Sequence, residues 1–182
     1  MRDGIRLAEE IYIFDIDGCI MPPIISNFDD DDKSREKTVN EILKNGSKIK
    51  LYTDFIKYYK KNCIKAESVV FITGRKKSEF GKLTESHLKP LNKIKRYQII
   101  YYPERKPLES DVYFEWKVKK IQEIINMNGK NQDIDYNKRI FFKIFDDMDE
   151  YFLMLKKFSE KFRLKAKLFL INEGEGWNSL II

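Results

Sequence analysis

Short apolar segments alternate with longer segments of helical periodicity along almost the whole chain. Most apolar segments are bounded by polar residues, glycine or proline, as β-strands usually are. Helical segments between successive strands favour parallel pairing, with the helices packed on both faces of one sheet. The pattern therefore predicts an α/β fold, a Rossmann-like three-layer sandwich with a mostly parallel five-stranded central sheet. The predicted strands cover residues 11–14, 69–72, 97–102, 140–145 and 166–171.

Five helical segments accompany these strands. The third precedes Pro90, and the residue before a proline disfavours helical geometry, so we expect that helix to stop before the proline. The fourth is expected to begin at Trp116, which places Lys117 at a helix N-terminus with its partial positive charge. The predicted helices cover residues 33–44, 52–62, 78–88, 116–127 and 148–162.

The length of 182 residues suits one domain with a real hydrophobic core, so we expect a single domain over residues 1–182. Residues 19–66 separate the first two predicted strands. They are expected to form a flap followed by a small helical segment, because Pro22 and Pro23 exclude a regular helix at the start.

Composition excludes several classes of protein. No apolar stretch approaches the roughly 20 residues that a membrane span requires, and the charged N-terminus does not resemble a signal peptide. We therefore expect a cytoplasmic protein with no membrane partner. Cys19 and Cys63 are too few for a disulfide framework, and the single histidine, His87, excludes a Cys/His zinc site. We expect His87 at the surface or at a helix end.

The formal net charge of +6 leaves two interpretations open. A basic surface attracts nucleic acid or another polyanion. Lysines spread along solvent-exposed helices give the same total charge with no such partner. The sequence does not decide between them, and it leaves the oligomeric state open.

Polar side chains gather where the predicted strands end. Asp15 and Asp17 follow the first strand, Thr73 follows the second, and Asp146 and Asp147 follow the fourth. In open parallel sheets, functional groups collect at the carboxyl ends of the strands. Gly18 then allows the chain to turn sharply away.

Carboxylates in this arrangement suit phosphoryl transfer. One carboxylate can attack phosphorus and form an aspartyl-phosphate, and a second can protonate the leaving oxygen and later deprotonate water. Clustered carboxylates also repel one another unless a cation lies among them. The all-oxygen set of Asp15, Asp17, Asp146 and Asp147 predicts Mg²⁺.

Positive charge and hydrogen-bond donors are also needed at the phosphate oxygens. The Thr73 hydroxyl, the Gly74 backbone N–H and the Lys117 ammonium are the candidates. Lys119 and Lys120 compete with Lys117 for the role of the catalytic lysine.

Four ordered motifs carry a resemblance to a known family. FDIDG, FITGR, a lysine followed by a helix, and IFDD resemble the motifs of the haloacid dehalogenase superfamily. The resemblance implies Asp15 as nucleophile and Asp17 as general acid/base, with the Asp17 backbone carbonyl on Mg²⁺. It implies Thr73 and Lys117 as groups that bind the phosphate, with Gly74 and Arg75 of the FITGR motif as substrate-binding residues. It also implies Asp147 as a direct metal ligand supported by Asp146. Cys19 stands where threonine or valine is usual.

The expected function is a Mg²⁺-dependent phosphomonoester hydrolase working through an aspartyl-phosphate. The gaps between motifs leave no room for a sizeable cap domain, which by resemblance suits large or exposed substrates. A nucleic-acid end, a nucleotide phosphate or another phosphorylated small molecule is therefore expected. Tyr101, Tyr102, Arg105 and Lys106 are candidates to stack a base and hold a phosphate. The alternative is a phosphotransferase, or a catalytically retired module that binds nucleic acid through its basic surface.

Overall fold

One six-stranded sheet forms the centre of the computed structural model, which describes residues 9–24, 32–103, 110–130, 140–148, 156, 165–171 and 179–181. The strand order is β3-β2-β1-β4-β5-β6. The first five strands in chain order pair in parallel, and β6 is antiparallel to β5. The strands are β1 (Glu9–Asp15), β2 (Ser68–Lys76), β3 (Gln98–Tyr102), β4 (Ile140–Asp146), β5 (Lys165–Ile171) and β6 (Ser179–Ile181).

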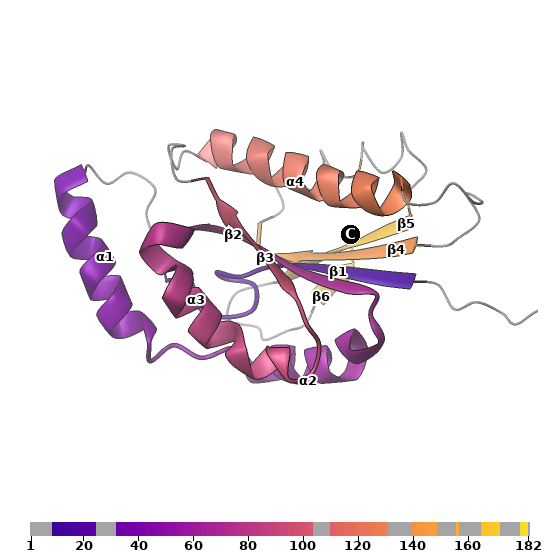
Figure 1. Cartoon of the computed structure of the whole chain (residues 1–182), viewed down its shortest axis with the longest axis horizontal. Helices are drawn as coiled ribbons and strands as arrows, with labels where there is room; N and C mark the ends of the chain where they lie inside the picture. Colours follow the sequence, from indigo (N-terminus) through magenta and orange to yellow (C-terminus); the bar gives the residue numbers. More distant parts are fainter. Residues whose placement is uncertain are drawn as a thin grey trace, which may run out of the picture.

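Helices cover both faces of the sheet, which makes the fold an α/β Rossmann-like sandwich (Figure 1). Helix α4 lies over one face, and α2 and α3 lie over the other, with α1 beside α3 (Figure 1). A short 3-10 helix, η1, follows α2. The bounds are α1 (Asp32–Gly46), α2 (Thr53–Asn62), η1 (Cys63–Lys65), α3 (Lys77–Asn92) and α4 (Ser110–Lys130).

The two faces of β1 contribute to two separate cores. Tyr12 and Phe14 pack with α2 and α3, whereas Ile11 and Ile13 pack with α4. Successive side chains of a strand point to opposite faces, so the next residue, Asp15, belongs to the α4 face. Burial on both sides explains why this strand is apolar along nearly its whole length.

The position of β1 in the sheet determines where a site is expected. It pairs with β2 on one side and with β4 on the other. The chain runs outward from β1 to β2 and β3, and then crosses to β4 on the opposite side of β1. The carboxyl ends of β1 and β4 therefore flank the point where the strand order reverses, and such points leave a crevice for ligands.

The predicted five-stranded, mostly parallel sheet is confirmed, and two strand details differ. The strand β6, which no sequence pattern indicated, adds an antiparallel edge. Strand β2 does not stop before Thr73 but continues to Lys76, with an irregular register against β3 between these two residues.

Two predicted helix boundaries are wrong. Helix α3 does not stop before Pro90 but continues through it to Asn92, because Leu88 and Leu91 of its last turn are fully buried. Burial of apolar side chains there outweighs the local preference of proline. Helix α4 begins at Ser110 rather than Trp116, so Lys117 lies inside the helix and not at its N-terminus. The helix predicted over 148–162 lies almost entirely outside the described residues.

The first residues of the predicted flap form a buried turn. The Gly18 N–H donates to the Met21 carbonyl, and the Ile20 N–H donates to the Ile16 carbonyl. Cys19, Ile20 and Met21 are fully buried. Residues 25–31 of the predicted flap lie outside the described residues. The turn therefore supports the end of β1 from below.

Several smaller predictions meet the structure here. Both cysteines are free and buried. Among the described residues, no helix is long and apolar enough to cross a membrane. His87 is buried within α3, where its Nε2 lies 2.9 Å from the Gly46 carbonyl oxygen, so its prediction as a surface or helix-end residue is wrong.

Candidate functional site

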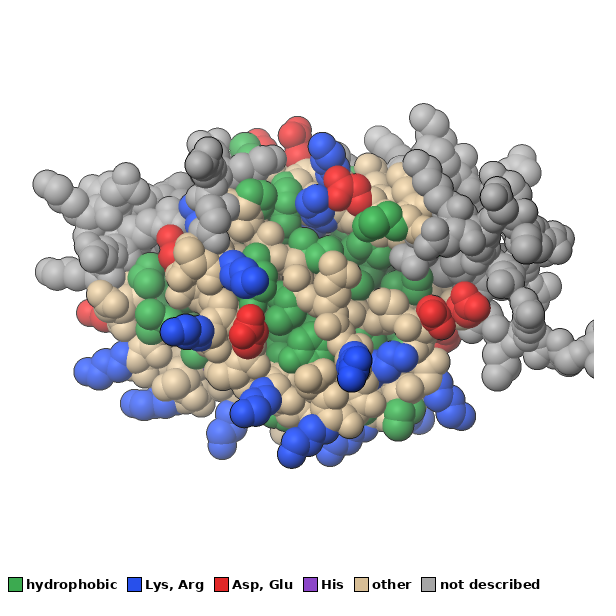
Figure 2. Space-filling view, in the orientation of Figure 1, with side chains coloured by type: hydrophobic (Ala, Val, Ile, Leu, Met, Phe, Trp, Pro, Cys, Tyr) green, Lys and Arg blue, Asp and Glu red, His purple; other side chains and the backbone are tan. Residues whose placement is uncertain are grey.

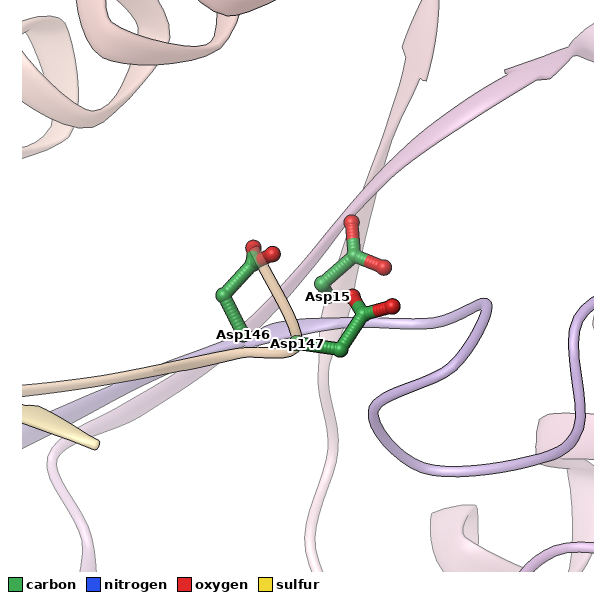
Figure 3. A group of neighbouring side chains, drawn as sticks. All are labelled: Asp15, Asp146 and Asp147. Carbon is green, nitrogen blue, oxygen red and sulfur yellow. The ribbon is translucent and has the colours of Figure 1, made fainter. Parts of the chain in front are cut away.

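Three carboxylates meet at the carboxyl ends of β1 and β4 (Figure 3). Asp15 ends β1, Asp146 ends the neighbouring β4, and Asp147 follows directly. One oxygen of each carboxylate lies within 4.8 Å of the other two. The structure thus brings together three of the four residues predicted as a metal set. We call Asp15, Asp146 and Asp147 the carboxylate cluster.

Lys117 supplies positive charge to this cluster from α4. Its Nζ lies 2.6 Å from Asp15 Oδ1 and also pairs with Asp146 Oδ2. The lysine is only 1% exposed. Of the three candidate lysines, Lys117 is the one that the structure places in the cluster, since Lys119 is exposed and Lys120 pairs with Glu123.

The cluster is short of positive charge. Burial raises the pKa of the Asp15 carboxyl well above its usual range, opposed by Lys117 and reinforced by Asp146 and Asp147. Burial likewise raises the pKa of Asp147 to about 7, and the nearby Asp146 adds to the shift. One buried lysine does not compensate three carboxylates, so the arrangement favours a further cation.

Asp17 is held apart from the cluster by Arg75. The guanidinium donates from Nε to Asp17 Oδ2 at 2.8 Å and from Nη2 to Asp17 Oδ1 at 2.7 Å. The Ile24 N–H also donates to Asp17 Oδ1 at 3.0 Å. The Asp17 carboxylate is therefore not one of the clustered ligands. The sequence assigned its backbone carbonyl, not its side chain, to Mg²⁺.

Arg75 lies behind Asp17 rather than at an open surface. Its side chain is buried, and its Nη1 donates to the Thr84 hydroxyl of α3 at 3.0 Å. In this arrangement the guanidinium faces Asp17 and Thr84, whereas the sequence predicted it as a substrate-binding residue. A bidentate arginine–carboxylate pair of this kind fixes the orientation of the carboxylate.

Thr73 and Gly74 lie within the irregular end of β2. Thr73 is fully buried, and its Oγ1 accepts the Arg75 N–H at 3.2 Å, which leaves the hydroxyl proton free to be donated. A side chain at Gly74 would contact the ring of Tyr113, because a Cβ there would lie 3.4 Å from Tyr113 Cε2. The absence of a side chain lets the ring approach the backbone at this position.

Tyr113 is the site residue that sequence reasoning missed. Its hydroxyl donates to Asp15 Oδ1 at 3.3 Å, and it precedes Lys117 by one helical turn. The four motifs do not include it, and it lies outside the helix predicted from Trp116. The available signal was its spacing of four residues from Lys117, which puts both side chains on one helix face.

Cys19 occupies the position at which the resemblance leads one to expect threonine or valine. Its side chain is fully buried, and burial raises the pKa of its thiol well above the usual range, so the thiol is neutral. It fills space beneath the cluster as a small apolar group would.

The residues predicted to stack a nucleic-acid base are not free to do so. The Tyr102 ring is buried against Tyr113 and Trp116, and the Tyr101 hydroxyl bonds to the Gly81 carbonyl. Arg105 and Lys106 lie outside the described residues. On the face seen in Figure 2, Lys and Arg side chains are dispersed, with no single dense patch. Neither observation supports a nucleic-acid partner.

Comparisons of the chain with models of known families, with curated proteins and with solved structures find no match. The chemistry of the site therefore has to be argued from its own side chains.

Proposed function

We propose that this chain is a Mg²⁺-dependent phosphomonoester hydrolase of the haloacid dehalogenase type, with Asp15 as the nucleophile. The observation that carries the proposal is the buried contact of Lys117 with Asp15 inside the carboxylate cluster, at the point where the strand order reverses. A lysine and carboxylates buried together away from any interface are costly as mere structure, and such groups concentrate at functional sites.

The donor set fits a hard divalent cation. Three carboxylates offer oxygen ligands from two adjacent strand ends, and Mg²⁺ prefers a few carboxylates together with water and phosphate oxygens. Asp15 and Asp147 would hold the ion, with Asp146 supporting them. When bound, Mg²⁺ neutralises the carboxylates and the approaching phosphate.

In the first step, an Asp15 carboxylate oxygen attacks phosphorus. A bond forms from that oxygen to phosphorus while the ester bond to the leaving alcohol oxygen breaks. Lys117 stabilises the negative charge of the nucleophile and of the phosphoryl group, since it lies 2.6 Å from Asp15 Oδ1. The Thr73 hydroxyl and the Gly74 N–H are the donors assigned to the remaining phosphoryl oxygens.

Asp17 handles the protons in both steps. It gives a proton to the leaving oxygen and then takes one from the water that attacks phosphorus and regenerates Asp15. Both Asp17 oxygens are bound by Arg75 in the structure. Acid/base catalysis therefore requires Asp17 to exchange one of these bonds for the substrate oxygen.

The described connections support a large or exposed substrate. Between β1 and β2 they form only the turn after β1, two helices and a 3-10 turn, and between β2 and β3 only α3. Nothing in these described segments forms a separate domain above the carboxylate cluster. A phosphorylated small molecule or a nucleic-acid end therefore meets the site without a large cap.

The direct test measures phosphate release from an aryl phosphate, with Mg²⁺ and with EDTA. Wild type is compared with Asp15→Asn and with the matched control Asp54→Asn, which alters an exposed carboxylate on α2. Oligonucleotides phosphorylated at the 3′ or 5′ end are assayed in parallel. We expect turnover that requires Mg²⁺, a fall of more than about 1,000-fold in Asp15→Asn, and normal activity in Asp54→Asn.

The outcomes separate the candidate functions. Release from oligonucleotides in preference to the aryl phosphate would identify a nucleic-acid end as the substrate class. Transfer to an added alcohol instead of water would indicate a phosphotransferase. Absence of metal-dependent turnover on every substrate, together with nucleic-acid binding that survives in Asp15→Asn, would contradict the proposal in favour of a binding module.

A further inference from the structure

Helix α4 presents two donors, not one, to the nucleophile of the proposed reaction. Lys117 Nζ lies 2.6 Å from Asp15 Oδ1, and the Tyr113 hydroxyl lies 3.3 Å from the same oxygen. The two residues are four apart, so their side chains lie one above the other on the helix face that meets β1. The Lys117 ammonium also lies 5.3 Å from the centre of the Tyr113 ring, which holds the two side chains together.

Packing alone does not explain a tyrosine at this position. The ring of Tyr113 contacts those of Tyr102 and Trp116, with centroids 5.7 Å and 5.8 Å away. Phenylalanine would fill the same space. The hydroxyl is the additional feature, and a buried hydroxyl is unfavourable unless it finds a partner. Its printed partner is the carboxylate of Asp15.

The same ring also reaches the other side of the expected phosphate site. It covers the open side of Gly74, where a Cβ would lie 3.4 Å from Tyr113 Cε2 and 3.7 Å from the hydroxyl oxygen. Tyr113 therefore contacts both the end of β1, which carries the nucleophile, and the irregular end of β2, which carries the assigned phosphate donors. Its ring spans two elements whose relative position matters for an in-line attack.

We propose that Tyr113 is a positioning residue for the Asp15 carboxylate. Together with Lys117 it fixes the rotation of that carboxylate and its place relative to Gly74. This inference rests on the proposed function, since it concerns how Asp15 is aimed in the same reaction. Tyr113 remains a neutral donor throughout and forms no bond to the substrate.

The expected effect is moderate. A hydrogen bond from a neutral donor to a charged acceptor contributes more than one between neutral groups, but 3.3 Å is longer than the usual O–H···O distance. We expect Tyr113→Phe to lower kcat about 10-fold with KM changed less than about 2-fold. Loss of aim weakens the transition state without removing a contact with bound substrate.

The matched control is Tyr59→Phe. Tyr59 is also fully buried, and its hydroxyl donates to the Lys95 carbonyl at 3.2 Å on the opposite face of the sheet. Both variants lose one buried tyrosine hydroxyl and keep the ring. We expect similar thermal midpoints for the two variants, and wild-type kcat for Tyr59→Phe only. A fall in kcat that occurs in both variants to the same extent would assign Tyr113 a merely structural role.

A second readout does not depend on turnover. Beryllium trifluoride adds to a carboxylate oxygen in place of a phosphoryl group, and its binding in the presence of Mg²⁺ is followed by fluorine NMR. We expect binding by wild type and Tyr59→Phe, binding about 10-fold weaker in Tyr113→Phe, and none in Asp15→Asn.

The two proposals fail in different ways. Wild type that neither turns over nor binds beryllium trifluoride would remove the proposed function and this inference with it. Wild type that does both, with Tyr113→Phe indistinguishable from it in kcat and in trifluoride affinity, would overturn the role of Tyr113 and leave the proposed function standing.

Discussion

Gly18 is the residue at which the chain turns beneath Asp147. Its φ is +76°, a left-handed conformation that other residues rarely adopt. A Cβ at this position would lie 2.0 Å from Asp147 Oδ2. The glycine thus serves two physical requirements, backbone conformation and space for a carboxylate. Only the first was visible in the sequence, because the distance to Asp147 depends on β4.

Gly18→Ala is accordingly expected to damage the site as well as the fold. We expect a loss of about 1–2 kcal/mol in unfolding free energy from the left-handed backbone, and a fall of at least about 10-fold in phosphate release from the displaced Asp147. Urea denaturation and the aryl phosphate assay measure the two effects. Gly81→Ala in α3 is the control, since its Cβ would meet only the flexible Lys77 side chain. Equal behaviour of the two variants would contradict the expectation.

At the scale of elements, Arg75 ties three parts of the chain together. It belongs to the end of β2, it binds Asp17 in the turn after β1, and it donates to Thr84 of α3. The Arg75 side chain is fully buried, and that of Asp17 is 22% exposed. The FITGR motif indicated a residue near the site. It did not indicate its partner, because that contact joins residues 58 positions apart.

Arg75→Ala is expected to lower the unfolding free energy by about 3 kcal/mol, because one member of a largely buried pair would lose its partner. Turnover should fall as well, since Asp17 loses its fixed orientation. Arg75→Lys should restore little of either, as an ammonium cannot reproduce the bidentate contact. Lys57→Ala, which removes an exposed ion pair with Asp54, should change stability by less than about 0.5 kcal/mol. Denaturant unfolding distinguishes these values, and a stable Arg75→Ala would contradict the structural role.

The helices show where local patterns fail. Pro90 predicted the end of α3, yet the buried Leu88 and Leu91 carry the helix through to Asn92. The start of α4 at Ser110 was also missed, and with it Tyr113. In both cases packing against the sheet decides the boundary, and packing partners are distant in sequence.

For the whole molecule, the carboxylate cluster makes stability depend on pH. Asp147 keeps its proton up to about pH 7 in the folded state but ionises near its model value of 3.8 when unfolded. Between these values the folded state binds more protons, so the unfolding free energy of the metal-free protein decreases as pH rises. The raised pKa of Asp15 acts in the same direction.

Thermal unfolding at pH 5 and pH 8 tests this expectation. The metal-free protein should melt lower at pH 8 than at pH 5, and Asp147→Asn should reduce the difference. Mg²⁺ should raise the midpoint more at pH 8 than at pH 5, because the ion binds ionised carboxylates. A metal-free midpoint that does not fall with pH, or falls equally in Asp147→Asn, would show that the cluster does not control this dependence.

The sequence by itself determined the order of strands and helices, the parallel sheet and the strand ends that carry Asp15, Asp146 and Asp147. These features follow from local periodicity and from the rule that parallel strands end at one edge. Only the tertiary structure decided which lysine meets Asp15, that Arg75 faces Asp17, and that Tyr113 joins the cluster. Each is a contact between side chains more than 50 positions apart. Such contacts depend on how the helices are rotated and seated on the sheet, which local patterns do not encode.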